Sequence, residues 1–170
     1  MCTPRSNRSA PGAAGANLLT KLISAYRSGL IGLKLAHTWR GYGSAIFLEF
    51  GSLTQWSRRD GSAGQPKGEF GVMIEWSWRV ESKNSIICGS WSDAALWGIA
   101  SRQLHGHAVS SVWTFGKLPE LAIELSHGYR VLSFMTSDGD PEWTLFDRRS
   151  PKSKWLCVRG GRVVEETSDV

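Results

Sequence analysis

Two segments of this chain resemble each other, and this internal similarity constrains the fold more than any single motif. Residues 30–50 match residues 104–125, with one inserted residue before the aligned pair Glu49 and Glu124. The other aligned pairs keep one offset of 74 residues (39 to 113): Leu30 with Leu104, Gly32 with Gly106, Leu35 with Val109, and Trp39 with Trp113. A repeat of this length is typical of two copies of one supersecondary unit, each unable to bury its apolar face alone.

The first copy predicts a helix followed by four strands. Apolar residues at helical spacing begin after Asn17, a plausible N-cap, and end at Gly29. Alternation and turn residues predict strands at 33–40, 45–50, 71–81 and 85–90. The polar segment 51–68 is expected to be either a mobile loop or a recognition element. The apolar face of strand 71–81 is predicted to lie in the core and comprises Val72, Ile74, Trp76, Trp78 and Val80.

The second copy repeats this plan, with a helix at 93–103 capped by Ser92. Its expected strands are 107–115, 120–126, 129–136 and 142–147, followed by a terminal hairpin, 155–159 with 162–166. Short turns between consecutive strands require antiparallel pairing, because a parallel crossover needs a dozen or more residues. The expected fold is therefore α+β, with two tandem helix–β–β–β–β repeats.

The chain has 170 residues, which favours one domain with one buried core. Residues 1–16 are rich in Ser, Pro, Gly and Ala and are expected to form a disordered leader. The single domain then comprises residues 17–170, with repeats at about 17–91 and 92–166.

The chain is basic, with a formal net charge of +5 and no Asp or Glu before Glu49. A second basic stretch spans residues 148–162. Positive surface raises the encounter rate with acidic proteins, nucleotides or nucleic acid, although it can equally be solvated surface. No apolar run is long enough to cross a bilayer, and the N-terminus lacks the apolar stretch of a signal peptide. With an odd count of 3 cysteines, these features predict a cytoplasmic protein without membrane partners.

Catalytic and metal-binding patterns are weak. Three carboxylates, Asp138, Asp140 and Glu142, form an incomplete set for a hard cation, and an ordinary turn explains them equally well. His105 and His107 could begin a zinc site, but no further ligand is placed beside them. The chain has no nucleophile elbow, phosphate-binding loop or dinucleotide fingerprint. We therefore expect no catalytic residue, no metal ligand and no cofactor, and leave enzymatic activity open.

The most suggestive candidate surface is the outward face of the predicted sheet. Charged residues on neighbouring strands, such as Lys34, Glu49 and Arg79, can pair with one another or meet a partner. Tyr and Arg are the side chains that interfaces favour. The candidate contact residues are Arg40, Tyr42, Arg58, Arg59, Glu75 and Arg79.

Two segments carry a resemblance to a known group. Residues 117–136 with Pro141-Glu142-Trp143, together with residues 74–81, resemble small uncharacterised bacterial proteins. Some compact proteins of this kind are similar to the immunity proteins encoded beside secreted toxins. The resemblance spans roughly residues 30–160 and implies a binding role, with no catalytic residue carried over.

The leading hypothesis is a cytoplasmic bacterial binding protein, of immunity or defence type, that occludes a partner protein such as a toxin or effector. The alternative is a nucleotide or nucleic-acid binding protein that uses the basic stretch 148–162 and exposed Trp or Tyr rings. A second alternative is an unfamiliar hydrolase built around Asp138, Asp140, Glu142 and a histidine. Homo-oligomerisation is left open.

Overall fold

The computed structural model describes residues 13–136 and 142–168. Residues 1–12 of the expected leader at 1–16, and most of the acidic turn, including Asp138 and Asp140, lie outside the described residues. Residues 13–16 of that leader belong instead to the first helix. The described elements, in chain order, are α1 (Ala13–Leu30), β1 (Leu35–Arg40), β2 (Ile46–Phe50), β3 (Phe70–Ile74), β4 (Trp78–Glu81), β5 (Ile86–Gly89), α2 (Ala94–Leu104), β6 (Val109–Phe115), β7 (Glu120–Leu125), a 3-10 turn η1 (Ser126–Gly128), β8 (Tyr129–Ser133), β9 (Trp143–Asp147), β10 (Lys154–Arg159) and β11 (Arg162–Thr167).

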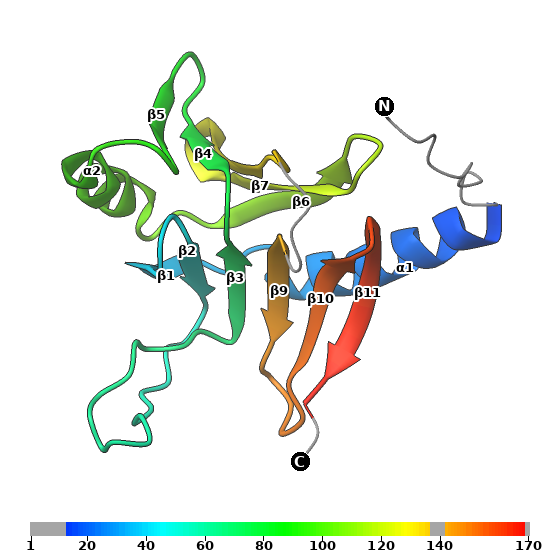
Figure 1. Ribbon diagram of the computed structural model, residues 1–170, viewed down its shortest axis with the longest axis horizontal. Coiled ribbons are helices and arrows are strands. Elements are labelled where there is room, and N and C mark those ends of the chain that lie inside the picture. Colours follow the sequence, from blue (N-terminus) through cyan, green and yellow to red (C-terminus); the bar gives the residue numbers. More distant parts are fainter. Residues whose placement is uncertain (1–12, 137–141, 169–170) are drawn as a thin grey trace, which may run out of the picture.

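The strands form two sheets, shown one above the other in Figure 1. The first sheet has the order β1-β2-β3-β9-β10-β11, and the second has the order β5-β4-β8-β7-β6. Each pair of neighbouring strands within the sheets is antiparallel. The described protein is therefore α+β with antiparallel sheets and two α-helices, as the sequence predicts.

Two self-contained tandem helix–β–β–β–β units, however, are not what the structure shows. In the described part of the chain, five strands follow α1 and six follow α2. The strands of each half are also divided between the sheets, because β4 and β5 join the second sheet while β9, β10 and β11 join the first. Pairing between distant strands, rather than between neighbours in sequence, decides this arrangement.

The two sheets nevertheless share matching positions. The first sheet, β1-β2-β3-β9-β10-β11, runs through three strands of the first half and then three of the second. The second sheet, written as β6-β7-β8-β4-β5, runs through three strands of the second half and then two of the first. Where the helices end, the Gly32 N–H donates to the Val109 carbonyl at 2.9 Å, and the Gly106 N–H donates to the Leu35 carbonyl at 2.8 Å. Both glycines have a positive φ, 87° and 81°, which favours residues without a Cβ.

Two tryptophans occupy another pair of matching positions, at the starts of β4 and β9. The Trp78 indole N–H donates to the Ser44 carbonyl, and that of Trp143 donates to the Pro119 carbonyl, both at 2.7 Å. Trp78 is 3% exposed and Trp143 is fully buried. Each ring thus fills the core while its one polar atom is satisfied by a turn of the backbone.

The prediction of a single strand at residues 71–81 is wrong, because the chain passes from one sheet to the other within this segment. β3 ends at Ile74, and β4 begins at Trp78 in the other sheet. At the crossing, the Ser44 hydroxyl contacts the carbonyl oxygens of Glu75 and Trp76 at 2.9 and 2.8 Å. Trp76 is 51% exposed and therefore does not share the buried face predicted for it.

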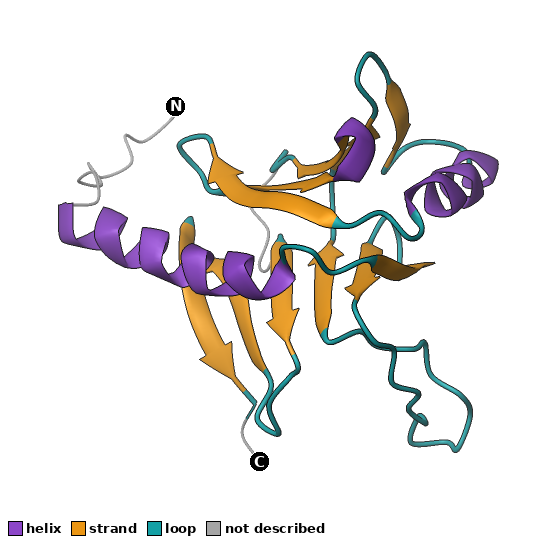
Figure 2. Ribbon diagram, turned by 180° about the vertical axis from the view of Figure 1, so that it is seen from behind, coloured by secondary structure: helices purple, strands orange, loops and turns teal. Residues whose placement is uncertain are grey.

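The helices also differ in detail from the prediction. α1 begins at Ala13, before the predicted cap Asn17, and the N-cap position of α2 is Asp93. Ser92 instead accepts a hydrogen bond from the Gly89 N–H at 2.9 Å. Figure 2 shows α1 lying across the first sheet, where Tyr26 packs edge-on against Phe70.

Candidate functional site

The face of the first sheet opposite α1 carries a cavity of about 490 Å³, which we call the sheet-face cavity. Its floor comes from β1, β2, β9 and β10, and its wall comes from the loop between β2 and β3. Five aromatic side chains line it: Trp39, Phe47, Trp56, Phe146 and Trp155. Aromatic walls of this extent are typical of a ligand site rather than of an ordinary polar sheet surface.

The aromatic floor consists of two cross-strand pairs. Trp39 of β1 stacks on its partner Phe47 of β2, with ring centroids 3.7 Å apart and ring planes 7° apart. Phe146 of β9 lies beside its partner Trp155 of β10, with centroids 6.4 Å apart. Because strand pairing holds both pairs, the rings are positioned by the sheet rather than by flexible loops.

Between these pairs lies a buried ion pair. The Arg148 Nη1 donates to Glu49 Oε2 at 2.8 Å, and the Glu49 side chain is only 1% exposed. Glu49 also accepts hydrogen bonds from the Gly68 N–H at 3.0 Å and from the Trp39 indole at 3.4 Å. A Cβ at Gly71 would lie 2.5 Å from the Arg148 guanidinium, so a larger residue there would displace the guanidinium from this position. The Glu49 carboxylate is therefore occupied by contacts that hold the fold together.

The loop over the cavity forms an irregular hairpin. Thr54 and Lys67 exchange backbone hydrogen bonds of 2.8 and 3.0 Å, and the Trp56 indole donates to the Gln65 carbonyl at 2.7 Å. The Lys67 ammonium lies 4.4 Å from the centroid of the Trp56 ring. Burial lowers the pKa of Lys67, Arg148 lowers it further, and Glu49 opposes both. Lys67 is thus a partly desolvated cation that lies over the Trp56 ring.

The electrostatic balance of the cavity favours an anion. Its charged lining residues are Arg58, Lys67 and Arg148 against the single carboxylate of Glu49. Within residues 13–136 and 142–168, no carboxylate forms an ion pair with Arg58 or Lys67. Two cations are therefore available to a ligand beside the aromatic floor.

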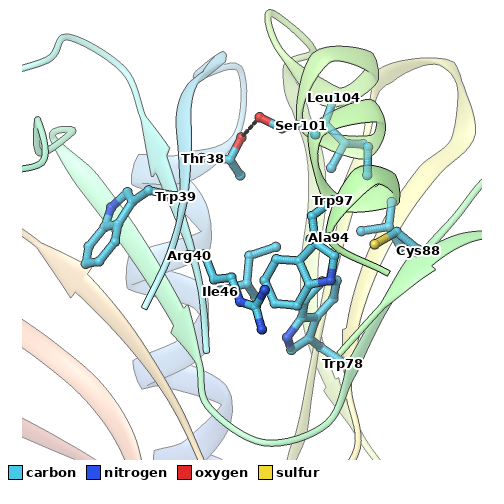
Figure 3. Close-up of a pocket in the computed structure, with 13 residues that line it drawn as sticks. Thr38, Trp39, Arg40, Ile46, Trp78, Cys88, Ala94, Trp97, Ser101 and Leu104 are labelled. Atoms are coloured by element: carbon cyan, nitrogen blue, oxygen red, sulfur yellow. Dashed lines mark hydrogen bonds between the residues drawn. The ribbon is translucent and has the colours of Figure 1, made fainter. Parts of the chain in front are cut away.

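The predicted contact residues do not share one face. Arg58 lines the sheet-face cavity, and Arg40 lines a second cavity beneath α2 (Figure 3). Tyr42 is fully exposed in the turn between β1 and β2, and Arg59 is exposed in the loop.

The remaining two predicted contacts lie near the sheet crossing. Arg79 is on β4, paired with Glu81, and its guanidinium lies 4.3 Å from the Phe134 ring centroid. Glu75 lies in the link between β3 and β4. The expected single charged face is divided because β4 belongs to the second sheet and because a bulge between Leu35 and His37 interrupts the pairing of β1 with β2.

Sequence reasoning missed the loop residues Trp56, Gln65 and Lys67. A tryptophan within a polar, glycine-bearing loop was the available signal, because such a ring needs a surface to lie against. In the structure that surface is Gly64, where any Cβ would clash with the indole.

Several of the described cysteine and histidine side chains are buried or make structural contacts. Cys88 and Cys157 are both buried, and burial raises the pKa of the Cys88 thiol. The His107 ring contacts the His127 ring, with centroids 5.1 Å apart. The His107 Nδ1 and the Ser126 hydroxyl share a hydrogen bond of 2.9 Å. Within the described ranges, no group of three or more His, Cys, Asp or Glu side chains could hold a metal ion.

No family model, curated protein or solved structure matches this chain. Among the described residues, neither helix is long and apolar enough to span a membrane.

Proposed function

We propose that this is a binding protein whose sheet-face cavity holds the base and phosphate of a nucleotide, either free or within single-stranded nucleic acid. The observation that carries the proposal is the aromatic floor, held by strand pairing, beside the two available cations Arg58 and Lys67. The proposal develops the nucleotide-binding alternative raised by the sequence. It adds residues of β1, β2 and the loop between β2 and β3 to the basic stretch 148–162.

Flat aromatic rings suit a nucleobase. Every base has a π-face, and stacking on a protein aromatic ring contributes about 1–3 kcal/mol per base. Trp39 and Trp155 use their indole N–H groups on Glu49 and Glu166, at 3.4 and 2.7 Å. What these rings offer a ligand is therefore chiefly their apolar surface.

The cations suit a phosphate. Arg58 projects from the loop and Lys67 lies on the wall, whereas Arg148 is already bound to Glu49. Charge-assisted hydrogen bonds from Arg or Lys to phosphate are roughly twice as strong as neutral ones. A ligand with a flat body and an anionic group would satisfy both parts of the cavity.

Tryptophan fluorescence titrations with adenosine 5′-monophosphate, adenosine and a ten-nucleotide oligo(dT) would test the proposal. We expect the monophosphate to bind more tightly than adenosine, and its affinity to fall steeply with added salt. A strand that binds about tenfold tighter than the mononucleotide would identify single-stranded nucleic acid as the source.

Lys67→Gln should weaken binding of the phosphorylated ligands and leave adenosine binding unchanged. Lys117→Gln is the matched control, since Lys117 is exposed on the turn between β6 and β7. Absence of binding by all three ligands, or an equal effect of both substitutions, would overturn the proposal.

A second candidate is the protein-partner function, of immunity or defence type, expected from the sequence. Exposed aromatic rings favour it: Tyr42 is fully exposed, Trp91 is 86% exposed and Trp76 is 51% exposed. Tyr and Trp are enriched at the centres of protein interfaces. Mixing the protein with the product of a neighbouring gene would test it, with Tyr42→Ser and Trp91→Ser expected to weaken any complex.

A further inference from the structure

We infer that the cavity beneath α2 is a second ligand site, which takes a small amphipathic molecule with an apolar body and an anionic head. We call it the α2 cavity. It measures about 300 Å³ and lies between α2, β1, β4 and β5. The α2 cavity is separate from the sheet-face cavity, because Trp39 is the single lining residue that the two share among the described residues. Figure 3 shows the Trp39 ring on the far side of β1 from Arg40 and Trp97.

The body of the cavity is apolar. Trp78 and Trp97 meet edge to face, with ring centroids 4.6 Å apart, and Ile46 and Leu104 extend the lining. The Trp78 indole donates to the Ser44 carbonyl at 2.7 Å, and the Trp97 indole donates to the Ser92 carbonyl at 3.1 Å. Both rings therefore present carbon surface to an occupant.

The polar groups are few and placed at the edge. The Thr38 and Ser101 hydroxyl groups bond each other at 2.7 Å. Arg40 is exposed, and its Nε and Nη2 donate to the Gly43 carbonyl at 3.2 and 3.1 Å. In the described chain, no acceptor is hydrogen-bonded to its Nη1, which leaves donors for a ligand.

Arg40 also determines the sign of the head group. Among the described residues that line the cavity, Arg40 is the one with a charged side chain, and none is acidic. Its guanidinium lies 4.5 Å from the Trp97 ring centroid, which holds it beside the apolar wall. A carboxylate or similar anion would bind there, whereas an ammonium group would be repelled.

The matching positions of the two sheets show why the cavity is hollow. Tyr26 of α1 and Ala100 of α2 each lie one turn before the buried leucine that ends the helix, and both are 4% exposed. Cys88 pairs with Val80 of β4, whereas Leu156 pairs with Leu145 of β9. At these two matching positions, the surroundings of α2 therefore have the small residues Ala100 and Cys88. The surroundings of α1 have the larger residues Tyr26 and Leu156.

Small side chains at both positions leave the volume that large ones fill elsewhere in the same molecule. Close packing is the rule in protein interiors, and voids larger than a water molecule are few. A 300 Å³ space with an apolar lining and few polar groups instead matches the lower end of ligand pockets.

Octanoate and its neutral counterpart 1-octanol are suitable probes. Octanoate should bind the full-length protein, shift the indole N–H resonances of Trp78 and Trp97, and bind more tightly than 1-octanol. Arg40→Gln should weaken octanoate about tenfold and leave 1-octanol unchanged. Arg102→Gln is the matched control, because Arg102 is exposed on α2 and does not line the cavity.

Filling the cavity tests its location. Cys88→Leu and Ala100→Leu, made separately, should each weaken both probes about tenfold or more. Lys67→Gln, at the other cavity, should leave both probes unchanged. Octanoate that leaves the Trp78 and Trp97 resonances of the unmodified protein unmoved would overturn the inference, even if both filled variants fail to fold. The inference would also be overturned if Arg40→Gln bound octanoate as tightly as the unmodified protein does.

Discussion

Glu49 and Arg148, 99 residues apart in the chain, form an ion pair of 2.8 Å on the face of the first sheet. The pair joins β2 to the segment that follows β9, and Arg148 Nη1 also donates to the Gly68 carbonyl at 3.1 Å. Through Gly68, the pair holds the base of the loop that walls the sheet-face cavity. The floor and the wall of that cavity are thus tied together at one buried point.

Glu49→Gln should destabilise the fold by about 3–5 kcal/mol, because it leaves the Arg148 charge partly buried without its counter-ion. Urea unfolding followed by circular dichroism would measure the change. Glu124→Gln breaks the exposed pair with Arg130, whose side chains are 30% and 49% exposed, and should cost below about 1 kcal/mol. Equal costs for the two substitutions would contradict this account of Glu49.

Acid should weaken the fold partly through Asp147. Hydrogen bonding from Arg149 is the main reason that the pKa of Asp147 lies below its ordinary value of 3.8. A carboxyl with a lowered pKa in the folded state contributes stability above its unfolded pKa and loses it as pH falls through the folded one. The stability difference between the native protein and Asp147→Asn should therefore be constant above about pH 4 and shrink below it.

That difference should stay below about 1 kcal/mol, because the Arg149 and Asp147 side chains are 47% and 21% exposed. Urea midpoints of both proteins between pH 2 and 6 would measure it. A difference that grows as the pH falls would show that the sign is wrong.

Affinity for adenosine 5′-monophosphate should fall at alkaline pH. Burial is the main reason that the pKa of Lys67 lies below its ordinary value of 10.5, so this cation is lost at a lower pH than a free lysine. Binding should be tightest where Lys67 is protonated and weaken as pH rises through its lowered pKa. Lys67→Arg should remove most of this dependence, because arginine stays charged. Fluorescence titrations between pH 7 and 10 would compare the two proteins.

Two glycine substitutions near α2 should have opposite effects. Gly98 lies within α2, and a Cβ there would meet only Arg102 at 3.6 Å, so Gly98→Ala should stabilise the fold by up to about 1 kcal/mol. Gly106 has a φ of 81°, so Gly106→Ala should destabilise it by about 1–2 kcal/mol although nothing crowds the site. Thermal unfolding of both variants would check the signs.

Local patterns predicted several elements well. The terminal hairpin was expected at 155–159 with 162–166, and the structure has β10 (Lys154–Arg159) and β11 (Arg162–Thr167) around Gly160 and Gly161. The α2 helix and β7 were also placed within one residue at each end. These elements depend on side-chain period and turn residues, which are properties of neighbouring positions.

The candidate site could not be predicted in the same way. Alternation was expected to put Glu49 and Arg40 on one exposed face, but Arg40 faces Trp97 beneath α2 while Glu49 lies buried against Arg148. One side of β1 faces α2, and the other faces the loop between β2 and β3. Periodicity distinguishes the two faces of a strand and does not identify what covers either of them.

By itself, the amino-acid sequence determined the α+β class and the antiparallel hairpins, because these follow from spacing along the chain. Only the tertiary structure decided that the chain leaves one sheet for the other at Glu75–Ser77, and that Glu49 meets Arg148. Those outcomes depend on which distant surfaces bury the most apolar area together, and that competition is not encoded within any single segment.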